Sequence, residues 1–275
     1  MVKYNINDMN LYKTTNRFMK SYLELKNRLK RTPTVYDLAD IDHLHYNGTK
    51  AVDFAIRKTK INKNSIVLDI GSGIGGPARY IAKKTGAKIY AVEIQKELNE
   101  VGNILTKEQK LNKNIKHINK DIQKFISTKI KFNCILSWLA LYHISDHKKL
   151  FGKIFSVLKS DGLFYSEDFF KIKDFDENEK NNLSKNFYAN HLVTYENYLK
   201  ELSDQNFIII AHYNMSSAWE VFTKKRLKNY EKNSKTNIKL HGLKTVRNIQ
   251  SFYRLAHNLL AEKKIGGIRF LCKKK

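Results

Sequence analysis

The sequence is poor in cysteine and proline, and it contains no long apolar run. Its 2 cysteines, Cys134 and Cys272, each lie in a short apolar segment with the character of a strand. This excludes a disulfide scaffold and a cysteine-rich zinc site, and it suits a reducing compartment. No apolar run approaches the ~18 residues of a membrane-spanning helix. The first residues lack the apolar core of a secretion signal, so we expect a cytoplasmic protein.

Acidic residues are also scarce, since 26 Asp and Glu stand against 51 Lys and Arg. The formal charge of +25 would suit a nucleic acid, an anionic lipid or an acidic substrate. Most of the excess is lysine, scattered together with asparagine and isoleucine, which is typical of a bias toward AT-rich codons. Arginine, which binds phosphate bidentately, is sparse. The densest basic runs are 224–226 and 273–275. We favour a solvated basic surface and keep nucleic acid as an alternative partner.

Apolar runs of strand length alternate with amphipathic segments of helical length over most of the chain. The 275 residues are enough for one large domain with an appended cap, and a hydrophobic content of 42% excludes wholesale disorder. The alternation predicts a parallel sheet with helices on both faces. The predicted strands are 65–70, 88–93, 115–119, 132–138, 162–168, 207–211 and, as a closing strand, 267–272.

Helices are predicted from the 3.6-residue period and from capping residues. Pro33 stops the first helix, Gly86 is the expected C-cap of the third, and Thr194 is an expected N-cap. The predicted helices are 10–31, 49–59, 76–84, 96–110, 146–159, 175–189, one beginning at Thr194, 217–228 and 243–263.

The sharpest motif is the segment 67–76, Val-Leu-Asp-Ile-Gly-Ser-Gly-Ile-Gly-Gly, in which a buried strand runs through a glycine-rich turn into a helix. Gly71, Gly73 and Gly76 satisfy the pattern G-x-G-x-x-G of dinucleotide-binding proteins. Glycine lets the backbone turn tightly and lets a ligand approach it. The helix N-terminus that follows offers unpaired N–H groups to polar ligand atoms.

Two carboxylates refine this interpretation. Asp69 stands two residues before the first glycine, where it would lie poorly beside a pyrophosphate but well beside a cationic cofactor such as S-adenosylmethionine. Glu93 ends the second predicted strand, where it can accept hydrogen bonds from ribose hydroxyls. An acid at that position suits both NAD and S-adenosylmethionine, so an NAD-dependent enzyme stays open as an alternative.

The segments Asp69-Ile-Gly-Ser-Gly73 and Gly75-Gly-Pro-Ala-Arg79 resemble those of class I S-adenosylmethionine-dependent methyltransferases. The second segment is similar to the branch that contains sarcosine/dimethylglycine, phosphoethanolamine, sterol and tocopherol methyltransferases. The resemblance covers about residues 41–211. It implies a Rossmann-like seven-stranded α/β sheet with cap elements at the N-terminus and in the C-terminal half. It also implies S-adenosylmethionine as cofactor and S-adenosylhomocysteine as product.

On this resemblance, residues 1–48 form an N-terminal helical cap or lid and residues 49–275 form the methyltransferase domain. Substrate-cap insertions are expected near 171–200 and 214–263. Asp121 matches the acid that usually binds the adenine amino group. The implied cofactor-binding residues are Asp69, Gly71, Ser72, Gly73, Gly75, Glu93, Ile94, Gln95, Asp121, Ile122 and Trp138.

The segment 138–143 matches the part of the family that faces both cofactor and substrate. In phosphoethanolamine-type enzymes a histidine at its end acts as a base, so His143 is the matching candidate, with Tyr142 or Tyr46 orienting the acceptor. An amine must lose a proton before it attacks the methyl group, and a histidine can take that proton. The alternative is a structural histidine that caps the next helix near Ser145.

Four further residues are candidates for substrate contact. His45 belongs with His43 to a possible lid. Metal binding by this pair would need a third ligand that the sequence does not supply, so no metal site is predicted. Tyr213 and Trp219 follow the sixth predicted strand and either hold an ammonium group by cation–π contact or belong to the core. Arg226 either pairs with an anionic group of the acceptor or lies on the surface.

The sequence therefore predicts methyl transfer from S-adenosylmethionine to a small molecule. The preferred acceptor is an amine that carries an anionic group, of the sarcosine or phosphoethanolamine type. A lipid or sterol acceptor and RNA methylation are the alternatives among methyltransferases. No oligomeric state follows from the sequence.

Overall fold

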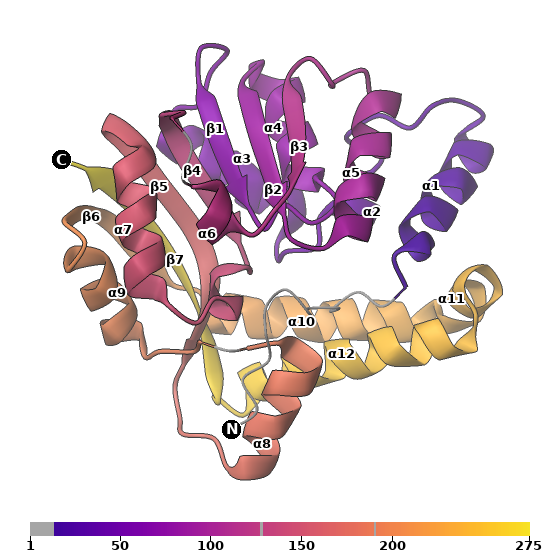
Figure 1. The fold of residues 1–275 in the computed structure, drawn as a ribbon. Coiled ribbons are helices and arrows are strands. Elements are labelled where there is room, and N and C mark those ends of the chain that lie inside the picture. Colours follow the sequence, from indigo (N-terminus) through magenta and orange to yellow (C-terminus); the bar gives the residue numbers. More distant parts are fainter. Residues whose placement is uncertain (1–13, 127–128, 190) are drawn as a thin grey trace.

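The computed structural model describes residues 14–126, 129–189 and 191–275 as a single sheet with helices on both faces (Figure 1). The 7-stranded sheet has the order β3-β2-β1-β4-β5-β7-β6. The strands β1 to β5 are parallel, whereas β7 runs antiparallel to both β5 and β6. The strands are β1 (Ile66–Ile70), β2 (Lys88–Glu93), β3 (Ile115–Asn119), β4 (Phe132–Trp138), β5 (Leu158–Lys171), β6 (Phe207–Asn214) and β7 (Ile265–Lys274).

This architecture confirms the predicted Rossmann-like, seven-stranded sheet and corrects one feature, because the sheet is not wholly parallel. After β6 the chain leaves through α10 (Ser216–Lys232) and α11 (Ser234–His241) and returns through α12 (Leu243–Ala261). The helices α10 and α12 lie side by side (Figure 1). The chain thus returns to the same end of the sheet at which β6 finished. Because β7 starts at that end, it has to run antiparallel to β6.

The predicted helices form at their predicted positions, though not always with the predicted length, and the short helices α2, α6 and α11 were not predicted. The predicted helix 175–189 forms as two pieces, α8 and a π-helical turn at Leu183–Phe187. Part of the first predicted helix, residues 10–13, lies outside the described residues. The other helices are α1 (Asn16–Leu29), α2 (Ala39–Asp42), α3 (Gly48–Thr59), α4 (Gly76–Thr85), α5 (Lys96–Glu108), α6 (Ile122–Phe125), α7 (His147–Val157), α8 (Glu177–Asn182) and α9 (Tyr195–Ser203).

Local capping chemistry fixes several of these boundaries. Gly86 ends α4 with a φ of 76°, a left-handed conformation that suits glycine, which confirms its predicted role. Thr194 begins α9, because its side-chain oxygen accepts a hydrogen bond from the amide of Asn197, as predicted. Asp146 does the same for α7 through the amide of Lys149. The starts of α7 and α9 are therefore each set by a single short polar side chain.

Two apolar layers cover the sheet. Side chains of α3 and α4 pack on one face, around Val52 and Ile81, and side chains of α6, α7 and α9 pack on the other, around Phe151 and Leu202. A further cluster joins α1 to α5. Another lies beyond the carboxyl ends of the strands, where α10 and α12 meet the end of β5. The division of the chain into a cap and a catalytic domain at residue 48 stays a prediction.

The cap segment α2 is tied to α4 by a buried ion pair. A guanidinium nitrogen of Arg79 lies 2.9 Å from Oδ2 of Asp42, and both side chains are at most 1% exposed. Arg79 also donates to the carbonyl of Gly102 in α5. Gly76 allows this approach, because a Cβ there would overlap the backbone carbonyl of Asp42. Position 76 therefore requires glycine so that the cap can reach the start of α4.

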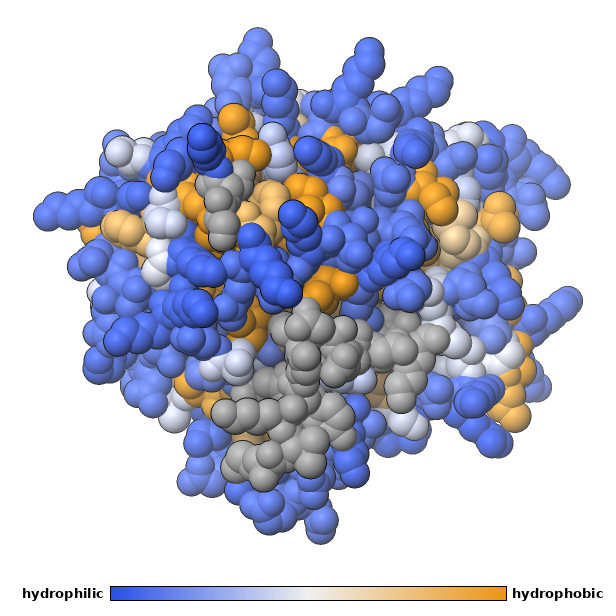
Figure 2. Space-filling view, in the orientation of Figure 1, coloured by the Kyte–Doolittle hydropathy of each residue, from blue (hydrophilic) through white to orange (hydrophobic). Residues whose placement is uncertain are grey.

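In the part of the chain that the structure describes, no helix has the length and apolar character of a membrane span. Figure 2 shows a largely hydrophilic face on which apolar residues appear in small, separate groups.

We expect Arg79→Met to lower the free energy of unfolding by about 3–5 kcal/mol, because the substitution leaves Asp42 buried without its cation. Chemical denaturation measures this change. The matched control is Lys84→Met, also in α4, which breaks an exposed ion pair with Asp53 and should cost less than about 1 kcal/mol. The double variant Asp42→Asn/Arg79→Met should recover part of the loss. Equal costs for the two single variants would contradict this role of the pair.

Candidate active site

A cavity of about 1350 Å³ opens at the carboxyl ends of β1, β2 and β4. Open α/β sheets place their ligands at this edge. The strand ends and the loops after them form one wall of the cavity, the segment 39–50 forms another, and α10 and α12 face both. The cavity is thus enclosed by parts of the chain that are far apart in sequence.

The glycine-rich turn after β1 forms the floor of this cavity. Gly71, Gly73 and Gly75 have φ values of 68°, 53° and 76°, in the left-handed region that favours glycine. The amides of Gly71 and Ser72 each donate to the carbonyl of Val92, with N···O distances of 3.0 Å. The turn is therefore anchored to β2, and its backbone faces the cavity without a side chain in the way.

Gly75 differs from the other glycines of the turn, because it does not line the cavity. It is the N-cap of α4, and a Cβ there would lie 2.6 Å from Cε1 of His117. Its predicted cofactor contact is therefore corrected: Gly75 shapes the turn and makes room for His117.

Asp69 is a buried carboxylate whose charge is not compensated. It ends β1 with 2% exposure, and its Oδ2 has no hydrogen-bond partner among the described residues. Burial, together with the nearby charge of Glu93, raises the pKa of Asp69 to about 7. A buried acid without a donor is costly to the empty fold. Its position therefore suits a ligand that brings a cation or a hydrogen-bond donor.

Glu93 lies beside this acid at the end of β2 and is held by the backbone. Its Oε2 accepts from the amide of Gly73 at 2.9 Å, and its Oε1 accepts from the amide of Gln95 at 2.8 Å. Burial raises the pKa of Glu93, and these amides oppose that shift. The carboxylate is thus fixed in place next to the glycine-rich turn.

The residues present fit the cofactor that the sequence implies. The buried carboxylate of Asp69, whose Oδ2 has no partner among the described residues, suits an ammonium group. The bare glycine backbone suits a sulfonium-bearing chain, and the fixed carboxylate of Glu93 suits a ribose. Asp121 lines the same cavity, although its Oδ1 also accepts from the amide of Gln123 at the start of α6. Of the implied cofactor residues, those that line the cavity are Asp69, Gly71, Ser72, Gly73, Glu93, Ile94, Gln95, Asp121, Ile122 and Trp138.

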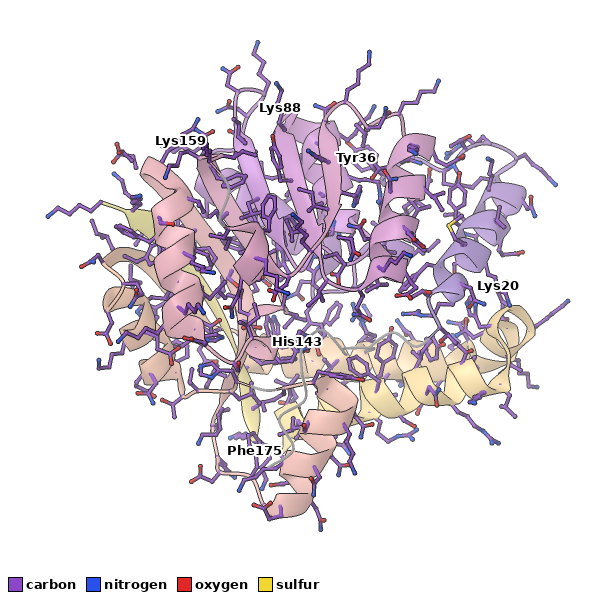
Figure 3. All side chains as sticks on the ribbon, in the orientation of Figure 1. Lys20, Tyr36, Lys88, His143, Lys159 and Phe175 are labelled. Carbon is purple, nitrogen blue, oxygen red and sulfur yellow. The ribbon has the colours of Figure 1, made fainter. Side chains whose placement is uncertain are left out.

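His143 closes a short 3-10 turn, Leu141–His143, directly after β4. Figure 3 shows it between the end of the sheet and the α10–α12 hairpin. Its Nδ1 lies 2.9 Å from the carbonyl oxygen of Tyr188, so Nδ1 carries the hydrogen and Nε2 carries the lone pair. Burial lowers the pKa of His143 to about 4. Asp146, and not His143, caps the next helix, so the helix-capping alternative for His143 is wrong.

The segment 44–46, part of the predicted lid and called the lid segment below, packs close to the glycine-rich turn, since a Cβ at Gly73 would lie 3.4 Å from Cδ1 of Leu44. His45 lies beside Trp138, and its Nε2–H donates to the carbonyl of Gly48 at 3.1 Å. Tyr46 lies against Trp219 and Phe222. His45, Tyr46, Tyr142 and His143 all line the cavity. The structure thus brings these predicted residues together with the glycine-rich turn.

Arg226 in α10 also lines the cavity, but its guanidinium already donates to the backbone of the lid. It reaches the carbonyl oxygens of His45 at 2.8 Å and Leu44 at 3.4 Å, and it lies over the ring of Phe222. The contacts show that Arg226 fastens the lid to α10. Its contact with an acceptor stays a prediction.

Two predicted substrate residues are outside the cavity. Tyr213 is 39% exposed on β6 and packs against Phe54, so its predicted contact with substrate is corrected. Trp219 is fully buried behind Tyr46 and lies against Gly267, where a Cβ would overlap the indole. Trp219 is therefore a core residue, the alternative that the sequence had left open.

Several residues that line the cavity were not predicted from the sequence. Lys225 belongs to the basic run 224–226, which was interpreted as surface, and its helical position places it on the cavity wall. Nothing local in the sequence marks the others. The missed residues include Lys185, Tyr188, Phe222, Lys225, Phe252 and Tyr253.

Comparison with known proteins agrees with this geometry. A family model described as a methyltransferase domain matches residues 61–235, and the chain belongs to this family. It is an S-adenosylmethionine-dependent methyltransferase, which replaces the NAD-dependent alternative.

Similar proteins include methyltransferases for amines and for sterols. The chain is 26% identical over 230 residues to phosphoethanolamine N-methyltransferase of Plasmodium falciparum. The aligned region covers 82% of this chain and 85% of that protein. It is 27% identical over 135 residues to sterol 24-C-methyltransferase of Kluyveromyces lactis. Here the aligned region covers 49% of this chain and only 34% of that protein. These relatives confirm the predicted branch of the family.

A solved structure confirms the fold. Phosphoethanolamine N-methyltransferase 2 of Haemonchus contortus, in complex with phosphomonomethylethanolamine and S-adenosylhomocysteine, superposes with a TM-score of 0.77 at 18% identity. The match covers 92% of this chain and 60% of that one.

We expect Asp69→Asn to stabilise the protein without cofactor and to weaken its binding of S-adenosylmethionine. The folded-state pKa of about 7 lies above the ordinary value of 3.8, so ionisation of Asp69 costs stability as the pH rises through about 7. A cationic ligand favours the ionised form. Loss of a charge-assisted hydrogen bond should weaken binding about 10- to 100-fold.

Thermal unfolding and calorimetric titration at about pH 5.5 and about pH 8 check this pair of opposite effects. Wild-type affinity for the cofactor should rise with pH, and that rise should be reduced in Asp69→Asn. A variant that binds the cofactor as tightly as wild type at both pH values would contradict the role of Asp69.

Proposed function

We propose that this methyltransferase transfers the methyl group of S-adenosylmethionine to the nitrogen of a small amine that carries an anionic group. A phosphoethanolamine-type acceptor is the first candidate. One observation carries the proposal: the cavity is acidic at the strand ends and basic and aromatic at the opposite side. The similarity to phosphoethanolamine N-methyltransferase over most of both chains supports the same class of acceptor.

The basic side of the cavity suits the anionic group of such an acceptor. Lys185 extends from the π-helical turn and Lys225 from α10, and both line the cavity. Neither lysine has an ion pair with an acid among the described residues. A phosphate or carboxylate placed between them would bring the amine toward Tyr142 and His143. The anionic group of the acceptor would then face the two lysines, and its amine would face the glycine-rich turn.

When bound, S-adenosylmethionine supplies a methyl group that is already activated by a sulfonium. The chain therefore has to hold the acceptor nitrogen in line, exclude water and accept a proton. The lid segment 44–46, fastened by Arg226, covers the cavity and limits its contact with solvent. In this proposal Tyr142 and Tyr46 orient the nitrogen, and Nε2 of His143 takes its proton.

The low pKa of His143 is compatible with this role. Burial disfavours the imidazolium in the empty cavity, so the ring is neutral above about pH 4 and can accept a proton. The neutral ring can therefore take the proton that the acceptor's ammonium group must lose before its nitrogen attacks the methyl group.

A lipid or sterol acceptor is the second candidate. The observation that favours it is the apolar part of the cavity wall along α10 and α12, formed by Phe222, Phe252 and Leu255. Similarity to sterol 24-C-methyltransferase over 49% of the chain supports it further. The net charge of +25 keeps RNA among the acceptors to be assayed.

A labelled-methyl assay distinguishes these acceptors. The substrates to compare are glycine, sarcosine, dimethylglycine, phosphoethanolamine, lipid extracts and total RNA. We expect transfer to phosphoethanolamine or to another anionic amine. We also expect Lys225→Gln to raise KM for that acceptor about fivefold, whereas Lys224→Gln, next to it but outside the cavity wall, should leave KM unchanged. Transfer only into lipid or RNA would overturn the proposal.

His143 is tested separately with two variants. His143→Ala should lower kcat about 10²- to 10³-fold, the usual contribution of a general base. His143→Gln can keep a hydrogen bond to the carbonyl of Tyr188 but cannot accept the proton, so it should be equally impaired. Steady-state kinetics with the identified acceptor measures both. Near-wild-type turnover of either variant would sink the base assignment.

A further inference from the structure

His147, His191 and Glu201 form a compact cluster outside the cavity. His147 is the first residue of α7, His191 lies in the connection before α9, and Glu201 lies within α9. One ligand atom from each residue can be chosen so that all of them lie within 4.8 Å of one another. The helices α7 and α9 that carry two of these residues pack side by side (Figure 1). Three potential metal ligands thus converge from three segments.

The hydrogen bonds of His147 leave its second ring nitrogen facing a carboxylate. Its Nε2 lies 2.9 Å from the carbonyl oxygen of Leu141, which can only accept, so Nε2 carries a hydrogen. Its Nδ1 lies 3.1 Å from Oε2 of Glu201. In a neutral ring, Nδ1 presents a lone pair to that oxygen. A proton or a metal cation has to lie between these two atoms.

His191 adds a second imidazole to the same carboxylate. Its Nε2 has no hydrogen-bond partner among the described residues and lies 3.5 Å from Oε1 of Glu201. The ring centres of His147 and His191 are only 4.1 Å apart. Protonation of both rings would place two cations in contact beside one carboxylate. A single divalent cation satisfies both nitrogens without that repulsion.

The separations fit the ligand sphere of zinc. Zinc binds imidazole nitrogen and carboxylate oxygen at about 2.0–2.2 Å, so neighbouring ligand atoms of a tetrahedron lie about 3.3–3.5 Å apart. The two nitrogen–oxygen separations to Glu201, 3.1 and 3.5 Å, bracket that range. The hydrogen bond from Nε2 of His147 to a backbone carbonyl is the contact that orients a ligating histidine. Calcium and magnesium prefer oxygen ligands, which makes them poor candidates.

We propose that His147, His191 and Glu201 bind a zinc-type divalent cation, with a fourth position open to water. This site was absent from the sequence prediction, because its ligands are separated by 44 and 10 positions and match no short motif. Its place in the fold indicates a structural role. The amide of His191 donates to the carbonyl of Tyr142 at 2.9 Å, and His147 bonds to Leu141. The cation would therefore fasten α7 and α9 to the 3-10 turn that carries His143.

The experiment uses the full chain without a histidine tag, stripped with a chelator and dialysed. Zn²⁺ is added, unbound metal is removed by gel filtration, and bound zinc is measured by elemental analysis. Competition with a chromophoric chelator gives the affinity. We expect one zinc per chain and a rise in Tm on zinc addition. Replacement by Co²⁺ should give the intense visible absorption of a four-coordinate site.

Two variants and a control decide the assignment. Glu201→Gln keeps the shape of the side chain but loses the charge, and His191→Ala removes a partly exposed ligand. Each should weaken zinc binding at least tenfold and abolish the Tm shift. His212→Ala, an exposed histidine on β6 outside the cluster, should bind zinc like wild type. Absence of stoichiometric zinc in wild type, or unchanged affinity in both ligand variants, would overturn the proposal. Circular dichroism confirms that the variants fold.

Discussion

The cavity depends on one buried charge, the carboxylate of Asp69 at the end of β1. Burial without a hydrogen-bond donor on Oδ2 makes this group costly to the empty fold. The glycine-rich turn that follows leaves backbone, and not side chains, around it. Glu93 is fixed next to it by two amides. The strand end is thus built for a ligand that brings positive charge, and the family's cofactor has that property.

Two arginines from different helices contact the segment 42–46. Arg79, in the helix after the glycine-rich turn, pairs with Asp42 just before the lid, and Arg226 in α10 donates to the lid's backbone carbonyls. The link through Arg79 is a buried charge pair, whereas Arg226 donates to carbonyl oxygens and lies over the rings of Tyr46 and Phe222. Together they fasten the segment 42–46 to both the sheet and the α10–α12 hairpin. Enclosure of the cavity therefore relies on a few polar contacts between segments that are distant in sequence.

Much of the central sheet could be predicted because its signals are local. Strands β2, β3 and β4 match their predicted ranges. Strands β2 and β4 are short, mostly apolar runs, as expected of buried parallel strands, whereas β3 at the edge of the sheet carries only Ile115 and Ile118 as apolar residues. The direction of β7 was not predictable from such runs, because it follows from how the α10–α12 hairpin returns the chain. The same limit applies to Tyr213 and Trp219. Both follow the predicted strand 207–211, but Tyr213 is still part of β6 and is exposed, whereas Trp219 lies in the core.

The sequence by itself determined the cofactor end of the site, where Asp69, the glycines and Glu93 lie within one strand–turn–helix–strand unit. Backbone sterics and strand direction bring these residues together whatever the rest of the chain does. Only the tertiary structure decided that Lys185 and Lys225 line the same cavity as His143, which the family resemblance had already indicated. It also decided the cluster of His147, His191 and Glu201. Side chains so far apart in sequence meet only through helix packing, which no local pattern encodes.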